Sequence, residues 1–259
     1  MSPFKRALAD AAFLSRRRKR RVSVDDFPAP GKPDGAPVAL APPVAGVFLW
    51  WATLAASDAE VARVSGWLAP AEHARAARFG REILSRRYVL GRALLRWALG
   101  NVLGLPPPAV PIVRGARGRP QLEGDTGPDF NVSHTEGVAL IGIARAGRIG
   151  VDVERADRDV RADGLARKFL TTAERSTLAP LSEAERRARF LRYWTCKEAM
   201  SKATGEGLSA PFRRIEVRLA DAIELVEGPG RYEPSRWRLH AVDVPRDYLA
   251  TLALWSDAS

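Results

Sequence analysis

The chain has 259 residues, of which 46% are hydrophobic, with a single cysteine and a formal net charge of +11. This apolar content can form one large core or two modest ones, which excludes a fibrous protein or one disordered throughout. The longest apolar stretches are shorter than the roughly 20 residues that cross a bilayer, so no membrane span is expected. Cys196 has no partner cysteine and the first residues lack the apolar core of a secretory signal, so a cytoplasmic protein is expected.

Residues 1–46 are predicted to form a flexible basic arm. Six consecutive basic residues at 16–21 precede a segment rich in proline, glycine and alanine at 28–43, and such compositions resist packing. The basic run could contact nucleic acid or a membrane, but a solvated tail is the simpler interpretation. Folded structure is therefore expected to begin at Val47.

A first lobe is predicted over residues 47–115. Residues 47–54 have the aromatic and branched apolar side chains of a buried strand. A short helix with proline at its start is expected at 70–79, and a long amphipathic helix at 81–103, where Gly104 follows.

A second lobe, residues 116–259, is predicted to contain more strands. The first three are expected at 130–133, 138–145 and 149–154, and the last two would form a tight hairpin through Ala146-Gly147. Capping-box patterns then mark helix starts at Thr171 and Ser182, and the second helix is expected to reach about Gly205. Three closing strands are expected at 214–219, 237–244 and 248–255. The mixed order predicts an α+β fold with mostly antiparallel sheets.

Two carboxylates mark the strand at 149–154. Because side chains alternate along a strand, Asp152 and Glu154 share one face while Val151 and Val153 point to the other. Carboxylates at this spacing repel unless a cation lies between them, and oxygen ligands suit Mg²⁺. Taken alone, the pair is better explained as a half-exposed strand with a solvated acidic face.

Two further groups could carry chemistry. On the helix that starts at Ser182, Trp194, Glu198 and Lys202 recur every four residues and share a face, although Glu198 and Lys202 equally fit an ordinary surface pair. Residues 131–135 end a strand and open a turn, which places Ser133 and His134 where a loop could bind a ligand. A lone histidine is more often structural.

These pieces resemble, in order and spacing, the motifs of the 4′-phosphopantetheinyl transferase superfamily, in particular its surfactin-synthetase-activator type. The matching segments are Gly118-Arg119-Pro120, Phe130-Asn131-Val132-Ser133-His134-Thr135, Gly150-Val151-Asp152-Val153-Glu154 and Trp194-Thr195-Cys196-Lys197-Glu198-Ala199, with Lys202 following. A weaker similarity covers Leu68 to Phe79 and Arg86-Arg87 with Gly91, so the resemblance spans residues from Val47 onward. It implies two similar α/β lobes related by pseudo-twofold symmetry, with coenzyme A and magnesium between them.

The resemblance also implies roles for individual residues. Asp152, Glu154 and Glu198 would bind magnesium against the coenzyme A pyrophosphate. Glu198, or a metal-bound water that it contacts, would act as base for the serine of an acyl or peptidyl carrier protein, and Lys202 would offset charge on the departing 3′,5′-ADP. The positions that resemble coenzyme A contacts are Arg87, Arg119, Ser133, His134 and Lys197. Relatives often carry lysine at the position of Arg119.

Two other functions remain open from the sequence. A metal-dependent nuclease or phosphodiesterase would also use three carboxylates and a basic surface, although it would leave the Asn-Val-Ser-His motif unexplained. A non-catalytic adaptor could bind carrier proteins through its basic patches, although the acidic residues argue against it. An acidic protein partner or a phosphate-rich substrate would both suit the positive charge. The partners expected from the resemblance are acidic carrier domains and not nucleic acid, and the chain length suggests a monomer.

Overall fold

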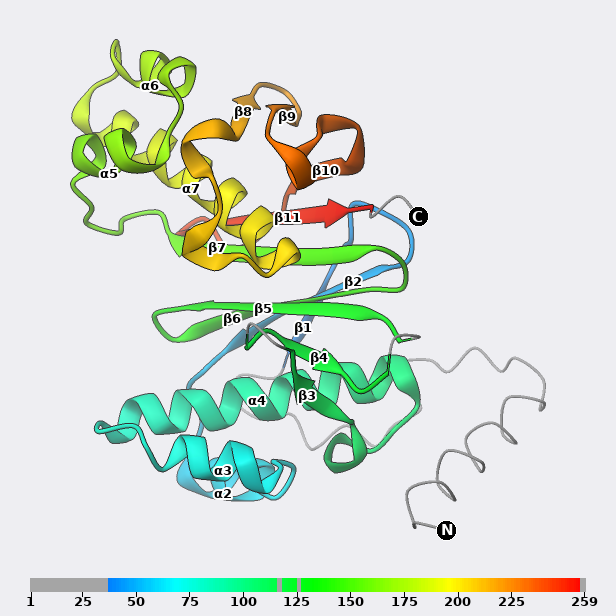
Figure 1. Ribbon diagram of the computed structural model, residues 1–259. Coiled ribbons are helices and arrows are strands. Elements are labelled where there is room, and N and C mark those ends of the chain that lie inside the picture. The colour runs from blue at the N-terminus through cyan, green and yellow to red at the C-terminus, as the bar shows by residue number, and fades with distance from the viewer. Residues whose placement is uncertain (1–36, 116–117, 125–126, 257–259) are drawn as a thin grey trace. The chain divides into compact units, whose positions relative to one another are not determined.

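The computed structural model describes residues 37–115, 118–124 and 127–256. Within this part, two antiparallel sheets are stacked face to face and each is covered on its outer side by a long helix (Figure 1). The α+β class and the antiparallel pairing are confirmed. Residues 1–36 of the predicted flexible arm at 1–46 lie outside the described residues.

The first sheet has the strand order β1-β2-β6-β5. Its strands are β1 (Val38–Leu40), β2 (Val47–Thr53), β6 (Val138–Ala144) and β5 (Asp129–Thr135). Trp50 of β2 packs toward the covering helix, whereas Leu49 and Trp51 pack toward the second sheet, as strand alternation requires. The expectation that folded structure begins at Val47 is wrong, because β1 pairs with β2 along its whole length.

The second sheet has the strand order β10-β11-β7. These strands are β10 (Trp237–Ala241), β11 (Tyr248–Trp255) and β7 (Arg148–Arg155). Val151 and Val153 of β7 meet Leu49 and Leu140 of the first sheet in an apolar layer that also contains Leu252. Burial of this layer holds the two sheets together.

The predicted hairpin between the strands at 138–145 and 149–154 is wrong. The turn at Ala146-Gly147 carries the chain from one sheet to the other, since β6 pairs with β5 and β2 while β7 pairs with β11. The hairpin is instead β5-β6, whose turn contains Gly137 at φ +76°. The structure therefore also differs from the predicted lobe boundary at residue 115, because β5 and β6 belong to the sheet that starts with β1 and β2.

Each sheet is covered by one 22-residue helix. Helix α4 (Glu82–Leu103) lies on the first sheet together with α2 (Asp58–Ser65) and α3 (Pro70–Ala76), and α7 (Glu183–Thr204) lies on the second. The capping box at Ser182 and the left-handed C-cap at Gly205, φ +75°, are both as predicted.

Smaller elements complete the described part. They are β3 (Ile112–Arg114) paired with β4 (Pro120–Leu122), β8 (Glu216–Leu219) paired with β9 (Ile223–Glu227), α5 (Ala162–Phe169) and α6 (Thr172–Leu178). Short 3₁₀ helices lie at Pro107–Ala109, Gly207–Ser209, Phe212–Arg214, Gly230–Tyr232 and Pro234–Arg236. Among the helices of residues 37–256, none is long and apolar enough to cross a membrane.

Candidate active site between β5, β7 and α7

Side chains of β5 join the two sheets at their neighbouring edges. Alternate residues of β5 accept hydrogen bonds from alternate backbone N–H groups of β7, a contact that we call the β5–β7 seam. The pairs are Asp129 with Ile149 at 2.8 Å, Asn131 with Val151 at 3.1 Å and Ser133 with Val153 at 3.2 Å. The seam fixes the face of β7 that carries the acidic residues relative to β5.

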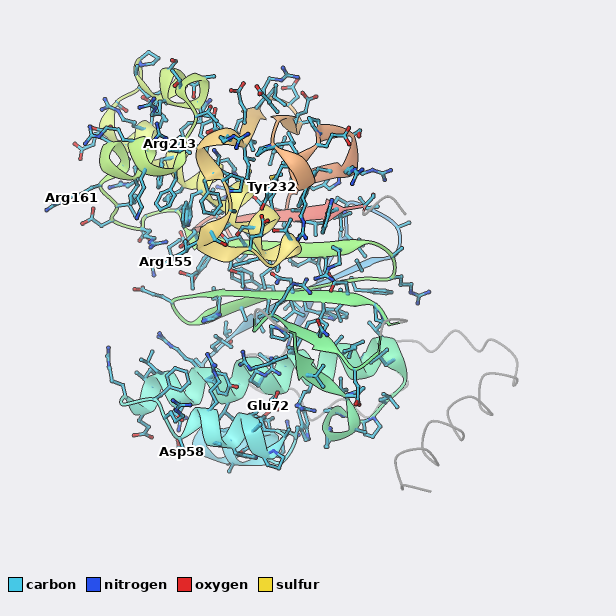
Figure 2. All side chains as sticks on the ribbon, viewed as in Figure 1. Asp58, Glu72, Arg155, Arg161, Arg213 and Tyr232 are labelled. Atoms are coloured by element: carbon cyan, nitrogen blue, oxygen red, sulfur yellow. The ribbon has the colours of Figure 1, made fainter. Side chains whose placement is uncertain are left out.

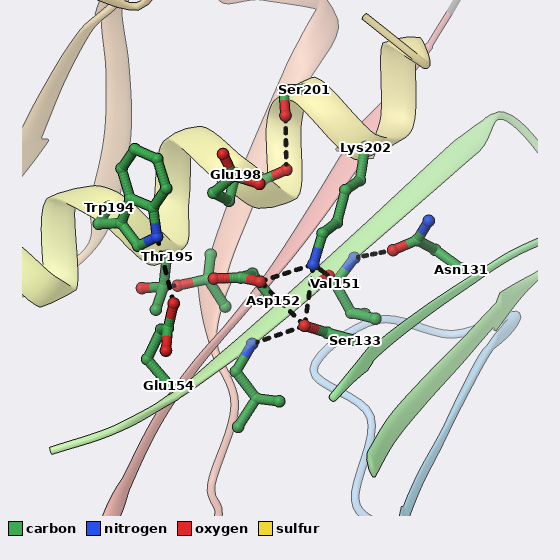
Figure 3. Close-up of polar contacts among 12 residues, drawn as sticks. Asn131, Ser133, Val151, Asp152, Glu154, Trp194, Thr195, Glu198, Ser201 and Lys202 are labelled. Carbon is green, nitrogen blue, oxygen red and sulfur yellow. Dashed lines mark hydrogen bonds and ion pairs between the residues drawn. The ribbon is translucent and has the colours of Figure 1, made fainter. Parts of the chain in front are cut away.

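Asp152 and Glu154 lie on one face of β7, as predicted, and this face is turned toward α7 (Figure 3). Lys202 of α7 reaches across, and its ammonium nitrogen lies 2.6 Å from Asp152 Oδ1 and 2.8 Å from Ser133 Oγ. Ser133 Oγ in turn donates to Asp152 Oδ1 at 2.9 Å. The structure thus brings three predicted residues, Ser133, Asp152 and Lys202, into direct contact.

Two carboxylate oxygens of the site have no partner. Asp152 Oδ2 and Glu198 Oε1 are buried and accept no hydrogen bond from any described residue. Burial and the negative charge of Asp152 raise the pKa of Glu198, while Lys202 opposes that rise. Burial and Asp152 also raise the pKa of Glu154. Burial and mutual repulsion make the ionised carboxylates of this site unfavourable, and a bound cation would offset both effects.

Trp194 holds Glu154. The indole Nε1–H donates to Glu154 Oε1 at 3.2 Å, and Arg158 forms an ion pair with the same oxygen. Trp194, Glu198 and Lys202 therefore all face β7 from successive turns of α7, which confirms the predicted helix face.

His134 lies beside the site, whereas Arg87 is placed only near the β5–β6 turn. His134 is exposed at the end of β5 and lines a hollow of about 750 Å³ together with Glu154, Arg155 and Arg158. Desolvation of the imidazole by the residues around it, followed by the positive charge of Lys202, lowers the pKa of His134. Arg87 lies on α4, half-buried, with Nη2 beside the turn at Gly137.

Arg119 does not present its guanidinium to a ligand, contrary to the predicted phosphate contact. Its side chain is only 10% exposed and forms a two-point ion pair with Asp129, at 2.7 and 2.8 Å. It also donates to the backbone carbonyls of Phe130 at 3.0 Å, Ile149 at 2.9 Å and Lys202 at 2.9 Å.

Lys197 is also placed differently from the prediction of a coenzyme A contact. Its side chain is 0% exposed, and Nζ lies 2.7 Å from Glu174. The same ammonium donates to the carbonyls of Phe212 and Ile215, at 2.7 Å each, and of Phe169 at 3.1 Å. Because α7 turns by about 100° per residue, Lys197 points away from the face that carries Glu198.

The site residues fit a divalent cation in part. Two unpartnered carboxylate oxygens on Asp152 and Glu198 are the ligand type that Mg²⁺ prefers. Yet Glu154 is turned to Trp194 and Arg158, and no three His, Cys, Asp or Glu side chains within the described ranges already form a metal-binding cluster. Glu154 would have to leave Arg158 to become a third ligand.

A second hollow, of about 570 Å³, lies between α3, α4 and the β3-β4 hairpin. Four arginines line it, namely Arg75, Arg78, Arg92 and Arg114, together with Glu72. Figure 2 labels Glu72 among the helices of this part of the protein. Arg75 and Arg78 fall within the weak family similarity at residues 68–79, whereas Arg92 and Arg114 lie outside the matching segments. Their spacing along the chain carries no signal, because the hairpin brings Arg114 to the helices only in the folded protein.

Two family descriptions match most of this chain. The 4′-phosphopantetheinyl transferase superfamily matches residues 148–253, and the N-terminal part of 4′-phosphopantetheinyl transferase matches residues 52–144. The division between the two matches falls at the turn from β6 to β7, where the chain passes between the sheets. It lies some 30 residues after the boundary at residue 115 expected from the sequence.

Individual relatives agree with these matches. The 4′-phosphopantetheinyl transferase HetI of Nostoc sp. is 35% identical over 176 residues, which cover 67% of this chain and 74% of HetI. The 4′-phosphopantetheinyl transferase psf-1 of Bacillus pumilus is 28% identical over 150 residues, covering 58% of this chain and 63% of its own. A holo-(acyl-carrier-protein) synthase structure from Bacillus anthracis, at 23% identity and a TM-score of 0.33 over 42% of this chain and 96% of its own, is too distant to support an inference.

The motifs Asp152-Val153-Glu154 and Trp194 to Glu198 thus lie on facing elements within a chain that HetI matches over two thirds of its length. The chain belongs to the 4′-phosphopantetheinyl transferase superfamily.

Proposed function

We propose that this protein transfers the 4′-phosphopantetheine group of coenzyme A to a serine of an apo acyl or peptidyl carrier protein, with release of 3′,5′-ADP. The observation that carries the proposal is the pair of buried, unpartnered oxygens on Asp152 and Glu198 at the end of the β5–β7 seam. Family membership supports the type of reaction, and the two unpartnered oxygens support the assignment of the active site to Asp152 and Glu198.

Asp152 and Glu198, joined by Glu154, would hold a magnesium ion. When bound, the ion would neutralise charge on the coenzyme A pyrophosphate and make its phosphorus more electrophilic. Lys202 already contacts Asp152, so its ammonium is placed to stabilise negative charge that develops on the leaving 3′,5′-ADP.

The remaining step needs a base and an acceptor. The carrier serine oxygen would bond to the phosphorus that bears pantetheine, the bond from that phosphorus to the bridging oxygen would break, and the serine proton would pass to Glu198. Burial and Asp152 raise the pKa of Glu198, which suits a carboxylate that accepts a proton. Because the nucleophile belongs to the carrier protein, this chain needs no reactive serine or cysteine of its own.

The substrates would approach from the arginine-lined and histidine-lined hollows. Coenzyme A carries several phosphate charges that match Arg75, Arg78 and Arg114. An acidic carrier domain would be attracted by the net charge of +11.

Mass spectrometry of an apo carrier protein tests the proposal. Incubation with this protein, coenzyme A and magnesium should add one phosphopantetheine group to the carrier serine, and a chelator should prevent the addition. Glu198→Gln and Asp152→Asn should each lower the rate by about a hundredfold or more, because each removes one charge from the site. Glu227→Gln, on the exposed side of β9, is the matched control and should react like the wild type.

Unchanged rates in both site variants would overturn the assignment of the site. Absence of any transfer across several carriers would favour the adaptor. Cleavage of DNA or RNA by the metal-loaded protein, lost in Glu198→Gln, would favour the nuclease.

A further inference from the structure

Arg119 connects three elements that meet beside the site, β5, β7 and α7. Its guanidinium bonds to the side chain of Asp129 in β5 and to the carbonyls of Phe130, Ile149 and Lys202. These partners lie up to 83 positions away in the sequence. One buried side chain therefore ties both edges of the β5–β7 seam to the last turn of α7.

The contact with Lys202 closes the end of a helix. The last carbonyls of a helix lack intrahelical partners, and in α7 the N–H groups of both Gly205 and Glu206 bond to Ser201. The carbonyl of Lys202 is instead satisfied by Arg119 Nε at 2.9 Å. A cation at this end also interacts favourably with the negative end of the helix dipole.

The position of that turn decides where the reactive side chains lie. Lys202 extends from the capped turn to Asp152, and Glu198 lies one turn earlier on the same face. Asp129 fixes Arg119 by the two-point ion pair and at the same time accepts from the N–H of Ile149 in β7. A displacement of Arg119 would therefore move the end of α7 relative to the acids of β7.

We propose that Arg119 and Asp129 form a positioning unit that sets the alignment of α7 against β7, and that Arg119 does not bind a phosphate of coenzyme A. The inference rests on the proposed function. It assigns a role to Asp129, which the motif comparison leaves without one. It also explains arginine at a position where relatives often carry lysine, because an ammonium cannot bond a carboxylate at two points and three carbonyls at once.

The two possible roles of Arg119 predict opposite behaviour of Asp129→Asn. If Arg119 positions α7, Asp129→Asn and Arg119→Lys should both lower kcat by about tenfold to a hundredfold, since small misplacements of reacting groups cost that much. The dissociation constant of coenzyme A, measured by calorimetry without carrier, should stay near the wild-type value in both. The double variant should be little worse than either single variant, because the two residues act as one unit.

If Arg119 binds phosphate, Arg119→Gln, which removes the positive charge, should weaken coenzyme A binding with little change in kcat, whereas a positioning role predicts lower kcat with an unchanged dissociation constant. A phosphate role also predicts that Asp129→Asn leaves binding equal or tighter, because it frees the guanidinium. That result would overturn the inference. All kinetics should be measured well below the unfolding temperature of each variant, so that lower stability alone cannot reduce kcat.

Arg148→Ala supplies the matched control. Arg148 lies 3.5 Å from the same carboxylate of Asp129, but its side chain is 40% exposed. It should change neither kcat nor coenzyme A affinity. A wild-type protein that transfers no phosphopantetheine would contradict the proposed function. An active wild type whose Arg119 variant binds coenzyme A more weakly at unchanged kcat would contradict only the positioning role of Arg119.

Discussion

The buried ammonium of Lys197 on α7 has a structural role beneath the helices that cover the second sheet. Its contacts with Glu174 and three backbone carbonyls satisfy a charge that would otherwise be costly to bury. Glu174 in turn caps α6 at Thr171 and accepts from the N–H of Val217. One ion pair thus joins α6, α7 and the strand β8.

Lys197→Met should destabilise the protein by about 3 to 5 kcal/mol, because it leaves the Glu174 carboxylate buried and unpaired. Unfolding in urea measures this loss. The double variant Lys197→Met with Glu174→Gln should recover part of it, since the buried charge is then gone. Weaker coenzyme A binding with an unchanged unfolding midpoint would instead support the ligand role that the sequence motif implied.

At the scale of elements, glycine decides how closely α7 and β7 approach. A Cβ atom at Gly150 would lie 1.8 Å from the carbonyl oxygen of Ala199 and 2.8 Å from the nitrogen of Ala203. Both are backbone atoms of α7 and cannot move aside alone. The short distance between helix and strand lets Lys202 reach Asp152.

Gly150→Ala should therefore destabilise the protein by several kcal/mol, roughly 3 or more, or force α7 away from the sheet. Gly91→Ala is the matched control, because a Cβ there meets only one side-chain atom, at 4.0 Å, inside helix α4. It should be neutral or stabilising by up to about 1 kcal/mol. Thermal unfolding of the pair distinguishes close packing from a general effect of added methyl groups.

Helices α3 and α4 are held together by Glu72, which caps α3 at Ala69 and pairs with Arg92 and Arg96. Burial opposes ionisation of Glu72, but the hydrogen bond from Arg96 and the charge of Arg92 outweigh it, so that its pKa falls below 4.5. A lowered pKa means that the folded protein binds a proton less readily than the unfolded chain. The stabilisation is therefore complete above about pH 4.5 and is lost as the pH falls through the folded-state pKa.

Glu72→Gln should cost about 3 kcal/mol at pH 7, because it breaks a buried ion pair. The difference from wild type should shrink when both proteins are unfolded at a pH below 4.5. As a control, Glu233→Gln removes an exposed partner of Arg236 and should cost less than about 1 kcal/mol. A penalty for Glu72→Gln that is independent of pH would show that its charge is not the stabilising feature.

Across the whole molecule, positive charge should govern encounter with the carrier. The net charge of +11 predicts that kcat/KM for an acidic carrier falls by about tenfold as salt rises from low to physiological concentration, because screening slows association. The turnover number at saturating carrier should change little. Transfer assays at several salt concentrations test this, and a carrier whose acidic residues are neutralised should show no such dependence.

Local patterns in the sequence predicted much of the fold and only part of the site. Alternation placed Asp152 and Glu154 on one face of β7, and spacing placed Glu198 and Lys202 together on α7, because both periods are local properties. The partners of Arg119 and Lys197 could not be predicted, because they come from segments that meet only after folding. The strand β1 carries no local sequence signal, because its three residues gain stability only by pairing with β2.

The β5–β7 seam gives the join between the two sheets an unusual sensitivity to mutation. A ladder of backbone bonds tolerates most substitutions, because every residue type except proline offers the same N–H and C=O groups. In the β5–β7 seam each hydrogen bond depends on one side chain of β5, so Asn131→Ala would leave the backbone amide of Val151 without its acceptor. Hydrogen–deuterium exchange at that amide should then be faster than at its neighbours. Single substitutions in β5 could therefore weaken the contact between the two sheets one hydrogen bond at a time, in evolution or by design.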